Sequence, residues 1–271
     1  MKRLIYAGAL LAGLTLTGCQ DEDAAPTPTP TPSTPKLDYY AESYEVAGLG
    51  FQPQIKVAYE YNGMGKVSRY TVLSYNPATG STEEQRYFAF SYLDGRVDKL
   101  AGYLPKASSP YIEYFYEYQA NGNVSRIREH NYGTGVNSEA NFSYDAVNNT
   151  INVAYTFSNG GSFQYEFQYD GENIQRDKTS RGSQLCSNGV YTYDDHVNPF
   201  RNLGYVDYTL NNLSVNNKLS EDVSYVACGF PTLVPESYAY EYNADGYPTE
   251  VMTTYKSGGS LARAKKEIYY K

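Results

Sequence analysis

A short tyrosine-rich segment recurs along the chain and constrains the fold more than any other feature. Each copy is an aromatic residue, one further residue and a tyrosine, followed by a turn rich in Asn, Asp and Gly. The seven closing tyrosines are Tyr61, Tyr92, Tyr118, Tyr144, Tyr169, Tyr193 and Tyr242. The first six follow one another at intervals of 24 to 31 residues, and the last interval is 49 residues. We predict a series of strand–turn–strand units, with one degenerate unit in the longest interval, around Asn211 to Val226.

The strand that enters each turn alternates between apolar and polar residues. Ile55, Val57 and Tyr59 fall on one face, and aromatic residues occupy every second position of the segment 163–169. This period of two predicts antiparallel strands with one apolar face. The Asn-Gly and Asp-Gly pairs supply the positive φ angles of tight hairpins. With Asp94-Gly95 and Asp170-Gly171 as two-residue loops, the predicted cross-strand pairs are Tyr92 with Val97 and Phe167 with Ile174.

The composition fits an extensive sheet with a thin core. The chain has 32 Tyr and no Trp, and Tyr is a strong strand former that can bury its ring while its hydroxyl stays hydrated. We expect an all-β fold, an antiparallel meander of roughly 14–16 strands built from hairpin repeats. So long a sheet is expected to be strongly curved or barrel-like, because closure hides its edges. A transmembrane barrel is the less favoured alternative, since the polar return strands at 124–129 and 174–178 would interrupt an apolar outer band.

The N-terminus has the pattern of an exported lipoprotein. Lys2 and Arg3 precede an apolar run, Leu4–Leu16, which is too short to span a bilayer comfortably. The run ends in Leu16-Thr17-Gly18-Cys19, which resembles a bacterial lipobox. The resemblance implies cleavage after Gly18 and acylation of Cys19, with palmitate as one of the chains. A simple signal peptide with an incidental Cys is the alternative.

The segment after Cys19 is predicted to be a linker. Its acidic start, Gln20–Asp23, resembles the surface-export signal of Bacteroidota lipoproteins, and a solvated charge run is the alternative. Alternating prolines at Pro26–Pro35 favour an extended spacer of about 30 Å, with a Pro-rich ligand for a partner domain as the other reading. We thus expect an outer-membrane protein, lipid-anchored at the cell surface. The predicted parts are a signal peptide at 1–18, a linker at 19–36 and a Tyr-rich β-repeat domain at 37–271.

The repeat itself also resembles known proteins. The unit Tyr-x-Tyr-Asp/Asn-x-x-Gly is similar to the YD repeats of RHS-type proteins, which implies a curved sheet or shell. The combination of lipobox, stalk and Tyr-rich meander resembles Bacteroidota lipoproteins whose domain has been described as porin-like. The fourth and sixth units depart from the pattern, because Asn148-Asn149 and Asn198-Pro199 stand where the glycine is expected. The resemblance implies a fold and no particular activity.

The sequence shows few groups for catalysis or metal binding. A net charge of −8 disfavours nucleic acid as a partner, and two His are too few for a His-built metal site. Asp194-Asp195-His196 could suggest acid–base or metal chemistry, but we expect these residues to form a hairpin turn. Because no catalytic, metal-binding or phosphate-binding motif appears, we predict no catalytic residues, no metal, no cofactor and no enzyme activity. Cys186 and Cys228 are predicted to form a disulfide, with two unpaired thiols as the alternative.

Three functions remain open. The first is a non-enzymatic binding module for a glycan or an envelope protein, with the membrane contacted only through the lipid anchor. In that reading the partner lies along a concave Tyr-lined face, although such rings more often form the core. The second is a structural scaffold without a small ligand. The third and least favoured is a hydrolase, which needs a nucleophile or paired carboxylates that the sequence does not reveal. The binding residues themselves cannot be assigned from the sequence.

Overall fold

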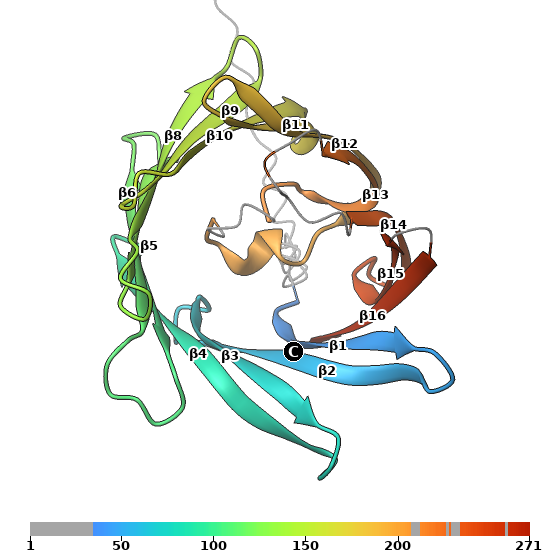
Figure 1. Ribbon diagram of the computed structural model, residues 1–271. Helices are drawn as coiled ribbons and strands as arrows, with labels where there is room; N and C mark the ends of the chain where they lie inside the picture. The colour runs from blue at the N-terminus through green and yellow to red at the C-terminus, as the bar shows by residue number, and fades with distance from the viewer. Residues whose placement is uncertain (1–34, 207–211, 226–227, 229–233, 258–259) are drawn as a thin grey trace, which may run out of the picture. The chain divides into compact units, whose positions relative to one another are not determined.

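The chain from Pro35 onward forms a closed antiparallel β-barrel (Figure 1). The computed structural model describes residues 35–206, 212–225, 228, 234–257 and 260–271. Sixteen strands follow one another around the barrel in sequence order, and β1 closes the sheet by pairing with β16. The prediction of an all-β, strongly curved meander is confirmed, with the strand number at the upper end of the expected range.

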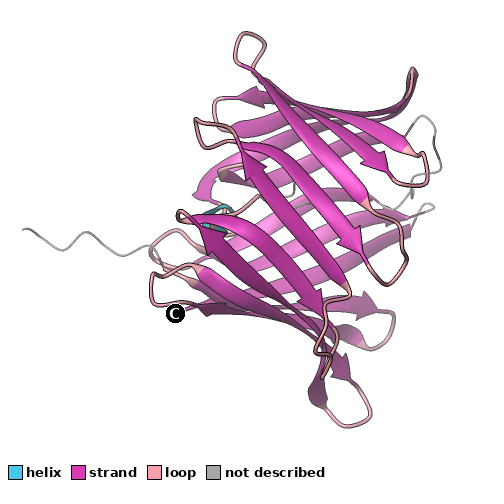
Figure 2. Ribbon diagram, turned by 90° about the vertical axis from the view of Figure 1, so that its left-hand side faces the viewer, coloured by secondary structure: helices cyan, strands magenta, loops and turns pink. Residues whose placement is uncertain are grey.

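The strands run obliquely across the side of the barrel (Figure 2). Their bounds are β1 Leu37–Val46, β2 Gly50–Tyr61, β3 Val67–Asn76, β4 Ser81–Leu93, β5 Arg96–Tyr103, β6 Ile112–Tyr118, β7 Val124–Asn131, β8 Ser138–Asp145, β9 Thr150–Phe157, β10 Ser162–Asp170, β11 Asn173–Arg181, β12 Gln184–Val197, β13 Asn216–Tyr225, β14 Val234–Tyr242, β15 Pro248–Ser257 and β16 Ser260–Tyr270. A single turn of 3₁₀ helix, η1 Arg201–Leu203, lies between β12 and β13. Among the residues that the structure describes, no helix has the length and apolarity needed to cross a membrane.

Closure of the barrel removes the two open sheet edges. β1 and β16 pair from Leu37 opposite Tyr270 to Tyr44 opposite Ala264. Beyond this ladder, the Lys271 N–H donates to the Lys36 carbonyl at 2.9 Å, and the Lys36 N–H donates to the Lys271 carbonyl at 3.2 Å. Among the described residues every strand therefore has a neighbour on each side, and such closure hides the edges that could pair with another chain.

The tyrosine-bearing face of the sheet lines the inside of the barrel. Val57 and Tyr59 of β2 are buried, as are Tyr114 and Tyr116 of β6. One buried cluster centres on β5–β11 and a second on β1, β2, β15 and β16. The expected division into an apolar and a polar face is therefore confirmed, and the apolar face is the lumen wall.

The outer face carries cross-strand ion pairs. Arg126 on β7 contacts Glu117 on β6 through two guanidinium nitrogens, and Lys178 on β11 lies 2.9 Å from Glu166 on β10. The Arg69 guanidinium lies 3.8 Å from the Tyr87 ring centre. A barrel that spans a bilayer needs an apolar outer band, and charges there are costly. The outer face of this barrel is thus suited to water, which argues against the transmembrane alternative.

The repeated tyrosines hold neighbouring strands together through their hydroxyl groups, in contacts that we call tyrosine latches. Each latch hydroxyl, near the end of one strand, donates to a main-chain carbonyl near the start of the preceding strand. This satisfies a half-buried phenol and a strand-end carbonyl at the same time. Tyr169 makes no such bond, and in β14 the latch is Tyr240 rather than Tyr242. The latches are Tyr61 to Leu37, Tyr92 to Val67, Tyr118 to Val97, Tyr144 to Val124, Tyr193 to Ile174, Tyr240 to Lys218 and Tyr270 to Pro248, with O···O distances of 2.6–2.9 Å.

One of the two predicted registers is correct. Tyr92 lies opposite Val97, and both residues of the Asp94-Gly95 loop have positive φ, at 50° and 77°. In the β10–β11 hairpin, Tyr169 lies opposite Ile174, whereas Phe167 faces Asp177, so that prediction is wrong. The cause is that Asp170 pairs with Asn173, which makes Gly171-Glu172 the loop, and a bulge between Gln168 and Tyr169 then shifts the ladder.

The sequence pattern predicted a degenerate hairpin unit in the longest interval between repeats, around Asn211 to Val226, and the described residues of that interval show that this prediction is wrong. Tyr193 and Tyr242 lie on β12 and β14, which are successive latch-type strands, and only the return strand β13 lies between them. The extra length comes from the β12–β13 connection, which enters the lumen (Figure 1). We call its described residues, 198–206 and 212–215, the plug.

Candidate functional site

The plug packs against the aromatic wall of the barrel. The Tyr205 and Phe90 rings meet edge to face with centroids 4.8 Å apart, and Phe200 meets Tyr40 in the same way at 5.6 Å. The Tyr116 hydroxyl donates to the Val206 carbonyl at 3.0 Å. The plug thus contacts the wall at three strands, β1, β4 and β6.

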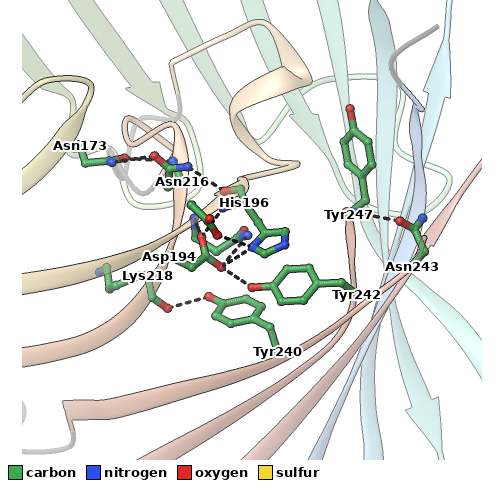
Figure 3. A network of polar contacts seen from close by, with 11 residues as sticks. Asn173, Asp194, His196, Asn216, Lys218, Tyr240, Tyr242, Asn243 and Tyr247 are labelled. Carbon is green, nitrogen blue, oxygen red and sulfur yellow. Dashed lines mark hydrogen bonds and ion pairs between the residues drawn. The ribbon is translucent and has the colours of Figure 1, made fainter. Parts of the chain in front are cut away.

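Asparagine side chains hold the base of the plug. The Asn198 N–H donates to the Val215 carbonyl at 2.7 Å, which brings the two ends of the connection together. Asn173 on β11 and Asn216 on β13 bond reciprocally, since the Asn173 amide donates to Asn216 Oδ1 at 2.8 Å and the Asn216 N–H donates to Asn173 Oδ1 at 3.0 Å (Figure 3). The Asn216 amide also donates to the His196 carbonyl at 3.0 Å. These bonds position the plug without any apolar periodicity in its sequence.

Cavities remain between the plug and the wall. One of about 500 Å³, the arginine cavity, is lined by Arg96 and Arg201 and by rings of β6, β8 and β10. A second of about 360 Å³, the lysine cavity, is lined by Lys218 and Lys266 together with rings of β1, β2 and β14. A third of about 450 Å³, the Arg86 cavity, borders Arg86, Glu42 and rings of β1–β4 and β6. Tyr205 of the plug borders all three cavities.

Asp194 and its neighbours form a polar network at the base of the plug (Figure 3). Asp194 Oδ1 accepts the N–H groups of His196 at 3.0 Å and Asn217 at 3.1 Å, and Oδ2 accepts the Tyr242 hydroxyl. The His196 ring stacks on Tyr242 with centroids 4.0 Å apart, and its Nδ1 lies 3.0 Å from Asp195 Oδ1 without forming a hydrogen bond. Burial and the Asp194 carboxylate both raise the pKa of Tyr242. Asp194 therefore bonds the backbone, as expected, but residues 194–196 belong to β12 rather than to a hairpin turn.

A second polar cluster lies on the lumen wall at β11–β14. The Tyr191 hydroxyl donates to Asp177 Oδ1 at 2.6 Å, and the Tyr238 hydroxyl donates to Glu221 Oε2 at 3.1 Å. Lys218 Nζ lies 2.8 Å from Glu221 Oε2 and 4.3 Å from the centre of the Tyr191 ring. Burial raises the pKa of Asp177 despite the Tyr191 hydrogen bond, which acts in the opposite direction.

This cluster was not predicted as a site, although the sequence carried a signal for it. The return strand at 174–178 places charges on both of its faces, so one set has to face inward. The strand register decides which of these charges face inward. The bulge in the β10–β11 hairpin brings Asp177, rather than Ile174, opposite Phe167. Gly189 completes the arrangement, because a Cβ there would meet the Asp177 carboxylate and lie 2.9 Å from the Tyr191 ring.

The predicted site residues fall in different parts of the chain. Cys19, the predicted lipidation site, lies outside the described residues, as do the signal peptide and the linker up to residue 34. Cys186 and Cys228 form a disulfide in the structure, with Cα atoms 5.3 Å apart. Within the described ranges, no group of three or more His, Cys, Asp or Glu side chains is placed to hold a metal ion.

Comparison with known proteins identifies relatives of the fold. No family model and no curated protein matches the chain. A porin-like protein from Bacteroides uniformis is 12% identical, with a TM-score of 0.57 over 87% of this chain and 98% of that one. A porin-like protein from Bacteroides vulgatus is also 12% identical, with a TM-score of 0.43 over 88% and 99% of the two chains. The TcdB2-TccC3-Cdc42 structure matches 86% of this chain but 14% of its own, with 14% identity and a TM-score of 0.35. The likeness to the Bacteroides uniformis protein shows that the chain has the fold of a porin-like β protein.

Proposed function

We propose that this protein is an outer-membrane lipoprotein at the cell surface and that its barrel binds a glycan or an envelope partner without catalysing a reaction. The lumen carries this proposal. Its cavities of about 360–500 Å³ fall within the size range of small-molecule sites, and their walls combine tyrosine rings with Asn, Arg and Lys side chains. Sugars fit such walls, since ring faces pack against their apolar faces and amides bond their hydroxyls.

The outer face of the barrel and the N-terminal pattern support the location. Ion pairs such as Arg126 with Glu117 suit an aqueous exterior, so attachment to the membrane falls to the acylated Cys19. The barrel fold shared with a porin-like Bacteroides protein is consistent with an outer-membrane origin.

The proposal that the barrel is not catalytic rests on how three lumen carboxylates are used. Asp194 accepts two main-chain N–H groups and a tyrosine hydroxyl, and Asp177 and Glu221 each accept a tyrosine hydroxyl. Their acceptor sites therefore hold the wall and the plug in place. In this proposal they stabilise the site rather than transfer protons.

A scaffold without a small ligand is the second candidate. It is favoured by the seven tyrosine latches, whose hydroxyls bond the main chain, and by the plug, which lies inside the barrel (Figure 1). In that case the aromatic wall serves stability alone, and an envelope protein binds elsewhere on the barrel.

A glycan array probed with the purified, lipid-bearing protein in detergent separates these candidates. We expect binding to a defined group of glycans, lost in Tyr205→Ala because Tyr205 borders all three cavities. Tyr132→Ala is the matched control, since this ring is 58% exposed on the loop after β7. Silence across the array, or equal binding by Tyr205→Ala, contradicts lumenal glycan binding and leaves the scaffold.

A further inference from the structure

The lysine cavity has an unusual charge for this protein. Two lysines line it, Lys218 from β13 and Lys266 from β16, and no Asp or Glu does so among the described residues. The chain as a whole has a net charge of −8. The charged side chains that border this compartment are therefore both cations, and each is paired with a glutamate outside the lining.

Both ammonium groups are held in place and remain accessible. Lys266 Nζ lies 3.1 Å from Glu42 Oε1, and Lys218 Nζ lies 2.8 Å from Glu221 Oε2. Neither glutamate borders the lysine cavity, and the two lysine side chains are 30% and 31% exposed. Each ammonium has three N–H donors, so it can keep its glutamate and still donate to a second anion.

Aromatic rings and amides surround the lysines. Lys266 Nζ lies 4.8 Å from the Tyr40 ring centre and 5.1 Å from that of Phe200, which fixes it beside two ring faces. Rings of Tyr59 and Tyr238 also line this cavity. The amide-bearing residues of its wall are Asn198, Asn212 and Asn217. The combination of cations, ring faces and amides matches a polyhydroxylated ring that carries a negative charge.

We propose that the lysine cavity binds an acidic saccharide of the hexuronate class, with the sugar carboxylate between Lys218 and Lys266. This inference rests on the proposed lumenal glycan binding and makes it more specific. Charge-assisted hydrogen bonds from the two ammonium groups hold the carboxylate, and the apolar face of the sugar ring packs on the aromatic wall. A volume of about 360 Å³, near the lower end for ligand pockets, fits one or two sugar units rather than a long polymer segment.

Calorimetry with the full lipid-bearing protein in detergent tests this proposal. The ligands are a galacturonic acid disaccharide, the matching neutral galactose disaccharide, and sodium acetate as the free carboxylate. We expect the acidic disaccharide to bind at least tenfold more tightly than either other ligand, because only it supplies both charge and ring.

Variants then assign the site. The double variants Glu221→Gln/Lys218→Met and Glu42→Gln/Lys266→Met each lower the affinity for the acidic disaccharide at least tenfold, and the glutamine substitutions avoid an unpaired glutamate. Lys178→Met is the matched control, since its ion pair with Glu166 lies on the outer face, and it leaves the affinity unchanged.

The outcomes separate this inference from the function on which it rests. Equal affinity for the acidic and neutral disaccharides overturns the acidic preference and leaves glycan binding intact. Tight binding of acetate overturns the role of the aromatic wall. Acidic binding that survives both lysine variants overturns the site, and an array without any binding overturns the function itself.

Discussion

The tyrosine latches allow a quantitative test of how the barrel is held together. In the variant Tyr92→Phe the ring stays, but the hydroxyl that donates to the Val67 carbonyl at 2.6 Å is lost. Val67 is fully buried, so the carbonyl loses its partner in a place that water reaches poorly. A hydrogen bond of this kind contributes about 1 kcal/mol to the free energy of unfolding.

Equivalent latches lie far apart on the barrel. Tyr144 donates to Val124 at 2.9 Å, and Tyr193 donates to Ile174 at 2.6 Å, on strands β8 and β12. Substitutions at distant sites without shared partners are additive. The triple variant Tyr92→Phe/Tyr144→Phe/Tyr193→Phe loses these three latches and the bond that the Tyr193 hydroxyl accepts from Ser214 Oγ. We therefore expect a loss of about 4 kcal/mol, which corresponds to a Tm lower by about 8–16 °C for a domain of this size.

Thermal and urea unfolding followed by circular dichroism and tyrosine fluorescence measure this loss. Tyr132→Phe is the matched control, because Tyr132 lies on an exposed loop from which its hydroxyl bonds Glu113 of β6. We expect the stability of this variant to stay within about 0.5 kcal/mol of the parent. A triple variant as stable as the parent, or a control as destabilised as the triple variant, refutes the latch reasoning.

Four further predictions concern other parts of the chain. Cys19→Ser is expected to abolish incorporation of radiolabelled palmitate, and labelling that persists contradicts lipidation at Cys19. Reduction of the Cys186–Cys228 disulfide, which closes a separation of 42 residues, is expected to lower the free energy of unfolding by about 4 kcal/mol in the chain-entropy model; two alkylatable thiols in the native protein contradict the pairing. Burial raises the pKa of Tyr61, Tyr92 and Tyr118 from 10.0 to about 12. The stability that these neutral phenols contribute is therefore full below pH 10 and is lost as the pH rises through about 12. Tyrosinate absorbance during unfolding at successive pH values measures this loss, and normal titration of all tyrosines in the folded protein contradicts it. Gly189→Ala is expected to destabilise the barrel by about 1–3 kcal/mol in urea unfolding, because its Cβ meets Asp177 and Tyr191; unchanged stability shows that this wall is not tightly packed.

The sequence predicts the strands well because each carries its own alternation. At Ile55–Tyr61, period two identifies both the strand and its lumenal face, and in the Asp94-Gly95 turn two positive φ angles set the register. Register fails at Phe167 because a bulge depends on contacts of the whole hairpin rather than on the loop pair alone. Closure depends on the pairing of β1 with β16 across the full length of the domain, which no local pattern encodes.

The site was harder to predict than the sheet. The plug has no apolar periodicity and is fixed by amides that come together only in the folded barrel, such as Asn173 with Asn216. The aromatic faces were expected to be concave, and they are. Which charged side chains lie among the rings depends on the strand register, which the sequence pattern does not fix. Lys218 and Lys266 are separated by 48 positions in the sequence and border one cavity only because β13 and β16 curve around the same lumen.

Closure of the barrel by β1 and β16 can be tested by cross-linking the two strands. Ala41 on β1 and Glu267 on β16 are register partners on the outer face, and Glu250 on β15 is the other partner of Glu267. Adjacent antiparallel partners lie within the Cα separation that a disulfide requires. We expect both Ala41→Cys/Glu267→Cys and the control Glu250→Cys/Glu267→Cys to form the new disulfide on mild oxidation, as read by non-reducing peptide mass mapping. A cross-link in the β15–β16 control but none between β1 and β16 would contradict a closed barrel.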